Sequence, residues 1–383
     1  MYRKSFLSGS KIQKISKDSL WHLPGVASHK IGFGICPDTG LIIQSPSPSP
    51  NVISKYYKEV ATYTNPGNNG KPTDTKIKDV NRLINFVYDS VGYISKKIFQ
   101  VGSSDGYTLS QFMKQGSDVF GIDPSIASNE LASNLYGVKT VTGDFENYDG
   151  SQKKYGLIIL THVLEHLFDP VSVMKKCNKM QNIGDFVLIE VPLFERIERF
   201  GPGLLTLEHI NYFSEGTLIE TLTSANYYPE CISKSFNHPE YPVITVMARK
   251  DENVKVIKSL DFEKNYTIFG KYIKNEELRW QKLEKKILSQ LPENKSIYIY
   301  GAGIHTTQLL ANTKINSYCD IIGLFDSSST KWGKKIGEFE CFNIDDVSLG
   351  VDDSILISSF AYEEEIYDFL TKNFNNNIVR IYG

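Results

Sequence analysis

The stretch KIFQVGSSDGYTLSQFMKQGSDVFGID, residues 97–123, decides the fold of this 383-residue chain. It contains an apolar run, a turn bounded by Gly102 and Gly106, a helical segment, and a second apolar run that ends in Asp123. This order predicts a strand, a glycine turn, a helix and a second strand. We therefore expect an α/β protein built on a doubly wound, Rossmann-like sheet.

The same stretch also predicts a ligand site. Glycine lets the backbone approach a ligand closely, and a helix N-terminus offers free N–H groups. Asp123 follows the turn by about 20 residues, a spacing that suits the two hydroxyls of a ribose. The turn lacks the third glycine of a dinucleotide fingerprint, and its Asp105 repels a pyrophosphate but tolerates a cationic, zwitterionic ligand. These residues indicate a site for an adenosine-containing molecule of that charge.

Four further segments follow the glycine turn in order. They are GIDPS at 121–125, GDF at 143–145, LTHVLEHLFDP at 160–170 and FVLIEVP at 186–192. Together with the turn they resemble the motifs of class I S-adenosylmethionine (SAM)-dependent methyltransferases. The resemblance covers about residues 80–250 and implies SAM as the cofactor.

That resemblance assigns the cofactor-binding residues. The glycine turn would face the methionine part of SAM, Asp123 the ribose, and Asp144 and Phe145 the adenine. The residues expected at the cofactor are Gln100, Gly102, Ser104, Asp105, Gly106, Asp123, Asp144, Phe145 and His162. Gln100 replaces the family's usual acid and Ser104 its usual glycine.

Composition excludes several other classes of protein. The net charge of −2 argues against binding nucleic acid through phosphate neutralisation. No apolar run approaches the length of about 18 residues that spans a membrane. The first residues lack the apolar core of a signal peptide, so a cytoplasmic protein is expected. The five cysteines are scattered, which favours reduced thiols over disulfides.

Residues 1–80 form a first unit around the sequence CPDTGL, which starts at Cys36. It resembles the second knuckle of the zinc-ribbon module that precedes some sugar methyltransferases. Thr39 stands where that module has its second cysteine. His22 and His29 could add two ligands at most, and tetrahedral zinc needs four. We expect a degenerate, metal-free module.

The candidate catalytic residues lie in LEHINYFS, residues 207–214. This segment resembles the Glu-His-x-x-Tyr-Phe-Ser stretch of SAM-dependent sugar C-methyltransferases. The resemblance makes His209 the base that takes the acceptor's proton and Glu208 the group that orients it. Similar segments also occur in enzymes that methylate oxygen. Tyr63 belongs to a tyrosine-rich segment that reaches into the active site of the sugar enzymes.

Two further features complete the assignment. Glu165-His166 matches a pair that holds a divalent metal in some quinone O-methyltransferases, but His162 replaces their third acid, so no metal is expected.

The C-terminal part of the chain predicts two further units. Residues 251–293 are predicted to form a helical linker. Residues 294–383 repeat the strand–glycine–helix pattern and predict a second Rossmann-like domain, either structural and dimer-forming or a holder of substrate nucleotide. Residues 81–250 are the methyltransferase domain.

The sequence therefore predicts a SAM-dependent methyltransferase that acts on a nucleotide-linked sugar or a surface-glycan precursor, at carbon or oxygen. One alternative is an O-methyltransferase with a small non-sugar acceptor. Another is a catalytically silent scaffold that retains SAM. The expected partners are the nucleotide-sugar or glycan-precursor substrate and, for the C-terminal domain, a second copy in a homodimer. Nucleic acid and a membrane span are not expected.

Overall fold

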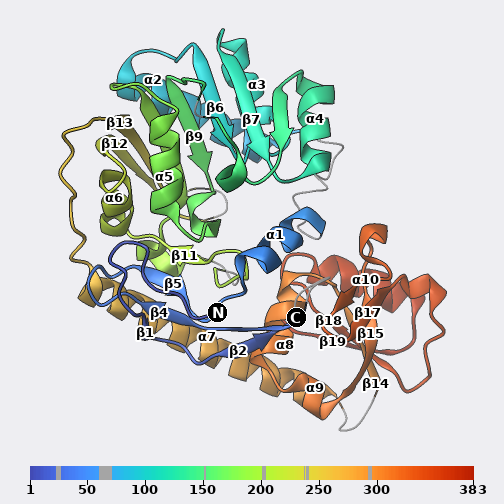
Figure 1. The fold of residues 1–383 in the computed structure, drawn as a ribbon. Helices are drawn as coiled ribbons and strands as arrows, with labels where there is room; N and C mark the ends of the chain where they lie inside the picture. Colours follow the sequence, from blue (N-terminus) through green and yellow to red (C-terminus); the bar gives the residue numbers. More distant parts are fainter. Residues whose placement is uncertain are drawn as a thin grey trace.

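The computed structural model describes residues 1–22, 27–59, 71–150, 152–200, 204–236, 238, 241–291 and 296–383. These residues form a central α/β sheet, a small N-terminal β unit and a C-terminal α/β sheet (Figure 1). A long helix runs beneath the N-terminal unit and leads into the C-terminal sheet (Figure 1).

The central sheet confirms the doubly wound fold. Its strands, in spatial order, are β12 (Tyr227–Ser235), β13 (Val243–Lys250), β10 (Phe186–Pro192), β9 (Leu157–Thr161), β6 (Lys97–Val101), β7 (Asp118–Asp123) and β8 (Lys139–Thr142). The five strands from β10 to β8 are parallel, whereas β13 and β12 are antiparallel to their neighbours. The parallel strands therefore end at one common edge, where ligands bind in open α/β sheets.

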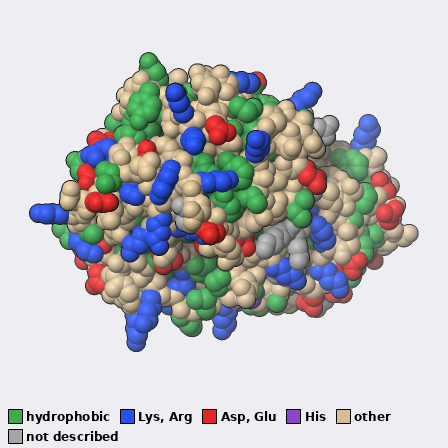
Figure 2. Space-filling model, turned by 45° about the horizontal axis from the view of Figure 1, so that its top comes forward, with side chains coloured by type: hydrophobic (Ala, Val, Ile, Leu, Met, Phe, Trp, Pro, Cys, Tyr) green, Lys and Arg blue, Asp and Glu red, His purple; other side chains and the backbone are tan. Residues whose placement is uncertain are grey.

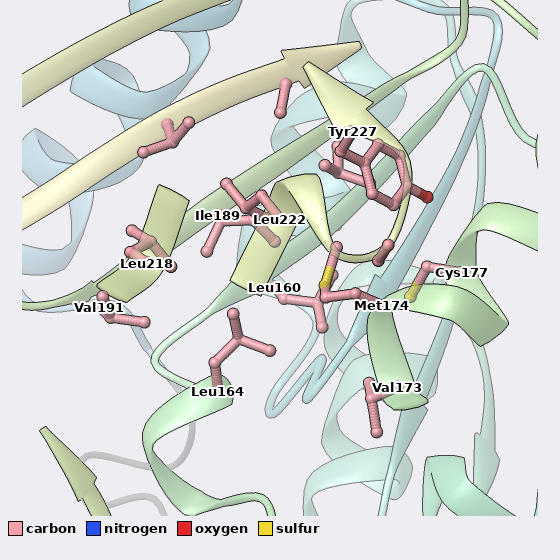
Figure 3. Close-up of a cluster of buried hydrophobic side chains, with 14 of the residues drawn as sticks. Leu160, Leu164, Val173, Met174, Cys177, Ile189, Val191, Leu218, Leu222 and Tyr227 are labelled. Carbon is pink, nitrogen blue, oxygen red and sulfur yellow. The ribbon is translucent and has the colours of Figure 1, made fainter. Parts of the chain in front are cut away.

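Helices cover both faces of this sheet. They are α2 (Asp74–Val91), α3 (Tyr107–Lys114), α4 (Ile126–Tyr136), α5 (Pro170–Lys179) and α6 (Glu215–Thr223). Alternate strand residues enter two separate cores, as the two-residue period of a strand requires. Figure 3 shows Leu160 and Ile189 facing Met174 of α5 and Leu222 of α6 on one side. This burial on both faces explains why the strand sequences are almost continuously apolar.

The N-terminal unit is joined by strand pairing to a segment that follows the last parallel strand of the central sheet. Its antiparallel sheet has the order β1 (Gln13–Lys14), β4 (Phe33–Ile35), β5 (Ile42–Gln44) and β11 (Asn211–Tyr212). A hairpin of β2 (Ser19–Trp21) and β3 (His29–Ile31) lies between β1 and β4 in the chain, and α1 (Pro50–Glu59), which follows β5, leads towards the central sheet. The fourth strand, β11, comes from a segment almost 170 residues further along the chain.

Hydroxyl groups surround Cys36, which is fully buried. The Ser8 Oγ lies 3.3 Å from the Cys36 Sγ. Burial raises the pKa of the Cys36 thiol, but hydrogen bonds from Ser5, Ser8 and Thr39 outweigh burial and lower it. Ser5 and Ser8 have the same three-residue spacing as Cys36 and Thr39, and both pairs meet at the Cys36 thiol.

The C-terminal domain has its own doubly wound sheet. Its strands, in spatial order, are β16 (Lys335–Ile336), β17 (Phe339–Phe342), β15 (Asp320–Phe325), β14 (Ser296–Tyr300), β18 (Ser354–Ile357) and β19 (Asn377–Arg380). The helices of this part of the chain are α7 (Phe262–Gln290), α8 (Ile304–Asn312), α9 (Ile315–Tyr318) and α10 (Glu363–Asn373). All strand pairs except β16–β17 are parallel. The helix predicted between the domains is α7.

The molecular surface mixes charges of both signs. Figure 2 shows Lys and Arg side chains interspersed with Asp and Glu over one face, with hydrophobic side chains between them. Within the described ranges, no helix is both long enough and apolar enough to cross a bilayer.

Candidate functional site

The glycine turn follows β6 and packs closely against its neighbours. Gly102 has a φ of +68°, and a Cβ added there would lie 2.8 Å from the Val163 Cγ2. The backbone N–H groups of Gly102 and Ser103 donate to the Ile122 carbonyl at the end of β7. A residue larger than glycine at position 102 would therefore be strained and would push away the loop after β9.

Asp123 ends β7 and holds the turn from the other side. Its carboxylate accepts hydrogen bonds from the backbone N–H groups of Ser104 at 2.8 Å and Ser125 at 2.9 Å. Burial raises the pKa of Asp123 above its usual value, and the two backbone hydrogen bonds oppose that shift. Each carboxylate oxygen has a second acceptor position, so Asp123 can also accept from a ribose hydroxyl.

A cavity of about 860 Å³ lies at this edge of the sheet. Its wall includes seven of the predicted cofactor residues, namely Gln100, Gly102, Ser104, Asp123, Asp144, Phe145 and His162. Asp105 and Gly106 are not among the lining residues. The Asp105 carboxylate accepts from the Tyr107 N–H, and Gly106 packs against Ala132. The volume is in the range that encloses a molecule of cofactor size.

The second part of the cavity wall is rich in histidine. His166 and His209 both line the cavity, and their ring centroids are 5.0 Å apart. Burial and the neighbouring His166 lower the pKa of His209 to about 3, so its imidazole is neutral at physiological pH. Tyr57, on α1, places its hydroxyl 2.7 Å from the His166 Nδ1. In Figure 1, α1 lies beside the edge towards which the parallel strands point.

The other predicted catalytic residues lie behind this wall or outside the described part of the chain. Glu208 is 3% exposed and is absent from the cavity lining. Burial raises the pKa of Glu208 to about 7, although a hydrogen bond from Tyr56 opposes the shift. Tyr63 falls in the segment 60–70, outside the described residues. Of the described tyrosines near that segment, Tyr57 contacts His166 and Tyr56 forms a hydrogen bond with Glu208.

A charged cluster connects the two parts of the cavity. His162, with a φ of +55°, lies with its ring nitrogens 3.5 Å from the carboxylates of Glu165 and Glu190. Burial lowers the pKa of His162, but the two carboxylates outweigh burial and raise it to about 10. The Arg82 guanidinium lies 2.6 Å from Glu190 and 2.7 Å from Asp79. Glu190 was not among the predicted site residues, although an acid inside the apolar strand FVLIEVP is a visible signal.

Residues near the start of the chain stabilise the part of the cavity wall that carries His166 and His209, here called the histidine wall. The Arg3 guanidinium is buried and donates to the Ile210 carbonyl at 2.7 Å, to the Asn211 Oδ1 at 2.8 Å and to the Phe168 carbonyl at 3.2 Å. The Gln44 amide donates to three carbonyls between 206 and 209. These contacts fix the loop that carries Glu208 and His209. No sequence motif indicated this role for residue 3.

Comparison with known proteins gives a partial match. Residues 82–232 match a family model described as a methyltransferase domain. An Aliivibrio fischeri protein named ubiquinone biosynthesis O-methyltransferase is 30% identical over 112 residues, which cover 27% of this chain and 47% of the relative. The protein of the same name from Shewanella halifaxensis is 28% identical over 149 residues, or 36% of this chain and 60% of the relative. The match thus spans about half the length of these relatives.

Solved structures give likenesses of low identity. The Burkholderia thailandensis 1,6-didemethyltoxoflavin-N1-methyltransferase, solved with S-adenosylhomocysteine, is 15% identical and has a TM-score of 0.43. It is covered completely and covers 60% of this chain. The N-methyltransferase NodS of Bradyrhizobium japonicum is 12% identical, with a TM-score of 0.39, and covers 48% of this chain and 90% of its own. The finer resemblance to sugar C-methyltransferases and their zinc-ribbon module remains a prediction. Residues 82–232, which match the methyltransferase-domain model, lie on the doubly wound central sheet.

Proposed function

We propose that this protein is a SAM-dependent methyltransferase that methylates a hydroxyl oxygen of a small acceptor. The observation that carries the proposal is that Asp123 and the wall of His166 and His209 line one and the same cavity. The end of the cavity at Asp123 has the groups expected for an adenosine cofactor. The wall at His166 and His209 supplies neutral imidazoles where an acceptor would lie.

The chain's residues fit SAM. The Gln100 carboxamide lines the cavity, is 3% exposed, and its Oε1 has no hydrogen-bond partner among the described residues. An orphaned buried acceptor of this kind suits the ammonium group of the methionine part. Asp123 would hold the ribose hydroxyls, and Asp144 and Phe145 would border the adenine. When bound, SAM supplies an electrophilic methyl group on a sulfonium.

The remaining wall would position and activate the acceptor. His209 presents an unprotonated imidazole and is the group proposed to take the acceptor's proton. Its lowered pKa makes it a weak base, which suits an acidic hydroxyl better than a carbon acid. Arg3 and Gln44 hold the His209 loop, and α1 closes the cavity beside His166. The names of the relatives support transfer to oxygen.

A second candidate acceptor is a nucleotide-linked sugar, methylated at carbon or oxygen. The Glu208–His209 pair and the second doubly wound sheet favour it. In that sheet Asp326 occupies the place that Asp123 has in the first, and its carboxylate accepts from the Ala302 N–H at 2.9 Å. Lys331 lies 2.7 Å from the same carboxylate, however, so this acid is already paired. The C-terminal domain would then contact the acceptor, but Asp326 would not bind the acceptor's ribose.

A transfer assay separates the two acceptors. Purified protein is incubated with methyl-labelled SAM and either a catechol or a nucleotide-linked keto-sugar, and the labelled product is identified. A methyl ether of the catechol supports the first proposal, and a methylated sugar supports the second. Calorimetric titration with SAM and S-adenosylhomocysteine provides the parallel test of the cofactor. If neither molecule binds, the methyltransferase proposal is wrong.

A further inference from the structure

The face of α2 that lines the cavity carries a cation. Lys76, Asp79, Val80 and Leu83 all belong to the cavity wall, and their spacing of three or four residues places them on one face of the helix. Lys76 is half-buried, and its ammonium forms no hydrogen bond or ion pair with any residue that the structure describes. Asp79, one turn further on, is already paired with Arg82 at 2.7 Å.

The direction of α2 brings Lys76 to the glycine turn. Only residues 92–96 separate α2 from β6, so the helix runs back along the strand. Leu83 and Val87, in the second half of α2, belong to one buried cluster with Ile98 at the start of β6. The first turn of α2, which contains Lys76, therefore lies towards the other end of β6, where the glycine turn begins.

The glycine turn itself has little to offer a carboxylate. The backbone N–H groups of Gly102, Ser103, Ser104 and Gly106 all donate to carbonyl or carboxylate oxygens of the protein. Asp105, in the same turn, is an acid that repels a second carboxylate. A ligand carboxylate at this end of the cavity therefore needs a cationic side chain from another element.

The other charged or basic groups of the wall are engaged or neutral. No arginine is among the described lining residues. Lys176 donates to two backbone carbonyls of residues 145–146, at 2.7 and 2.9 Å. The two ring nitrogens of His162 each face a buried carboxylate at 3.5 Å. The histidine wall is neutral, because burial lowers the pKa of both of its imidazoles.

We propose that Lys76 binds the carboxylate of the methionine part of SAM and so determines the preference for cofactors that carry this group. The inference rests on the proposed function and adds a residue to its cofactor site. Gln100 offers a buried acceptor for the ammonium group, and Lys76 offers the donor that the carboxylate requires. Because Lys76 is half-buried, the contact should be stronger than an exposed surface ion pair.

Calorimetric titration of the full chain with four ligands tests the proposal. SAM and S-adenosylhomocysteine carry the carboxylate, whereas decarboxylated SAM and 5′-methylthioadenosine lack it. The test variant is Lys76→Met, which removes the charge and keeps a long, unbranched side chain, and Lys76→Arg restores the charge. Lys78→Met is the matched control, because Lys78 lies on the same helix, is exposed and is not part of the cavity wall. Urea unfolding of each variant reports whether the fold is intact.

We expect Lys76→Met to weaken the binding of SAM and S-adenosylhomocysteine by about 5- to 50-fold. 5′-Methylthioadenosine should bind within about twofold of the parent, and decarboxylated SAM, which carries an extra net positive charge, should bind no more weakly than to the parent. Lys76→Arg should recover most of the affinity, and Lys78→Met should match the parent. In the parent, added salt should weaken S-adenosylhomocysteine more than 5′-methylthioadenosine, and Lys76→Met should lose this difference.

Three results would overturn the inference. They are unchanged affinity of Lys76→Met for S-adenosylhomocysteine, an equal loss for all four ligands, and the same loss in Lys78→Met. Unchanged affinity would also leave Lys76 to the acceptor and not to the cofactor. In each of these cases the parent still binds SAM, so the proposed function stands. A parent that binds neither SAM nor S-adenosylhomocysteine would instead contradict the proposed function itself.

Discussion

Replacing Asp123 by alanine should weaken SAM binding in a predictable way. The carboxylate would lose a charge-assisted contact with the ribose, worth roughly 1.5–3 kcal/mol. That corresponds to an increase of about 10- to 150-fold in the dissociation constant. The substitution also removes the acceptors of the Ser104 and Ser125 N–H groups, so the glycine turn should loosen. We expect a loss of about 1–3 kcal/mol in the free energy of unfolding from this second effect.

The chain offers a matched control on the same strand. Asp118 begins β7 and is exposed, whereas Asp123 ends it and is buried. Calorimetry should show that Asp118→Ala binds SAM as the parent does, and urea unfolding should separate the loss of stability from the loss of affinity. If Asp123→Ala binds SAM within about twofold of the parent, the ribose assignment is refuted.

Three further predictions concern the acceptor side and its supports. His209→Gln should lower turnover by about 100- to 10,000-fold while SAM affinity stays unchanged in calorimetry, and Glu208→Gln should lose less because Glu208 lies behind the wall. Arg3→Ala should lower the free energy of unfolding by about 2–4 kcal/mol in urea titration, because it leaves buried carbonyls unpaired, and Arg3→Lys should recover only part of it. Asp79 is predicted to stabilise the fold above about pH 4: burial raises its pKa, but His238 and Arg82 outweigh burial and lower it to about 2. The parent should therefore exceed Asp79→Asn in unfolding free energy by about 2 kcal/mol near neutral pH. This difference should shrink as the pH falls from about 4 to 2. A difference that stays constant over this range would contradict the ion pairs of Asp79.

Local sequence signals were sufficient to predict the sheet and the glycine turn after β6. The turn at 102–106 and Asp123 are consecutive parts of one strand–helix–strand unit, so their spacing in the sequence fixes their spacing in the fold. The same holds for the second glycine turn and the C-terminal sheet. Apolar runs without alternation predicted strands buried on both faces, and helices do cover both faces here.

The other half of the site depends on contacts between distant segments. Glu165 and His166 meet His209 only because the turn Leu164–His166 and the loop before β11 are bonded to each other and to Arg3. Neither spacing nor composition relates position 3 to position 210. Glu190 lies within the seven-residue strand β10 and is visible in the sequence as an acid in an apolar run. Its partners Arg82 and His162 lie more than 25 residues away, so its ion pairs could not be predicted.

The pairing of β5 with β11 has a consequence for how this chain can be divided. A fragment that starts at the methyltransferase domain would leave Asn211 and Tyr212 as an unpaired strand edge, and the loop before them would lack Arg3 and Gln44. Such a fragment would keep the cofactor half of the cavity and lose the geometry of the other half. Exchanging the N-terminal unit for that of a relative would therefore change the wall that carries His166 and His209, without any substitution in residues 82–232.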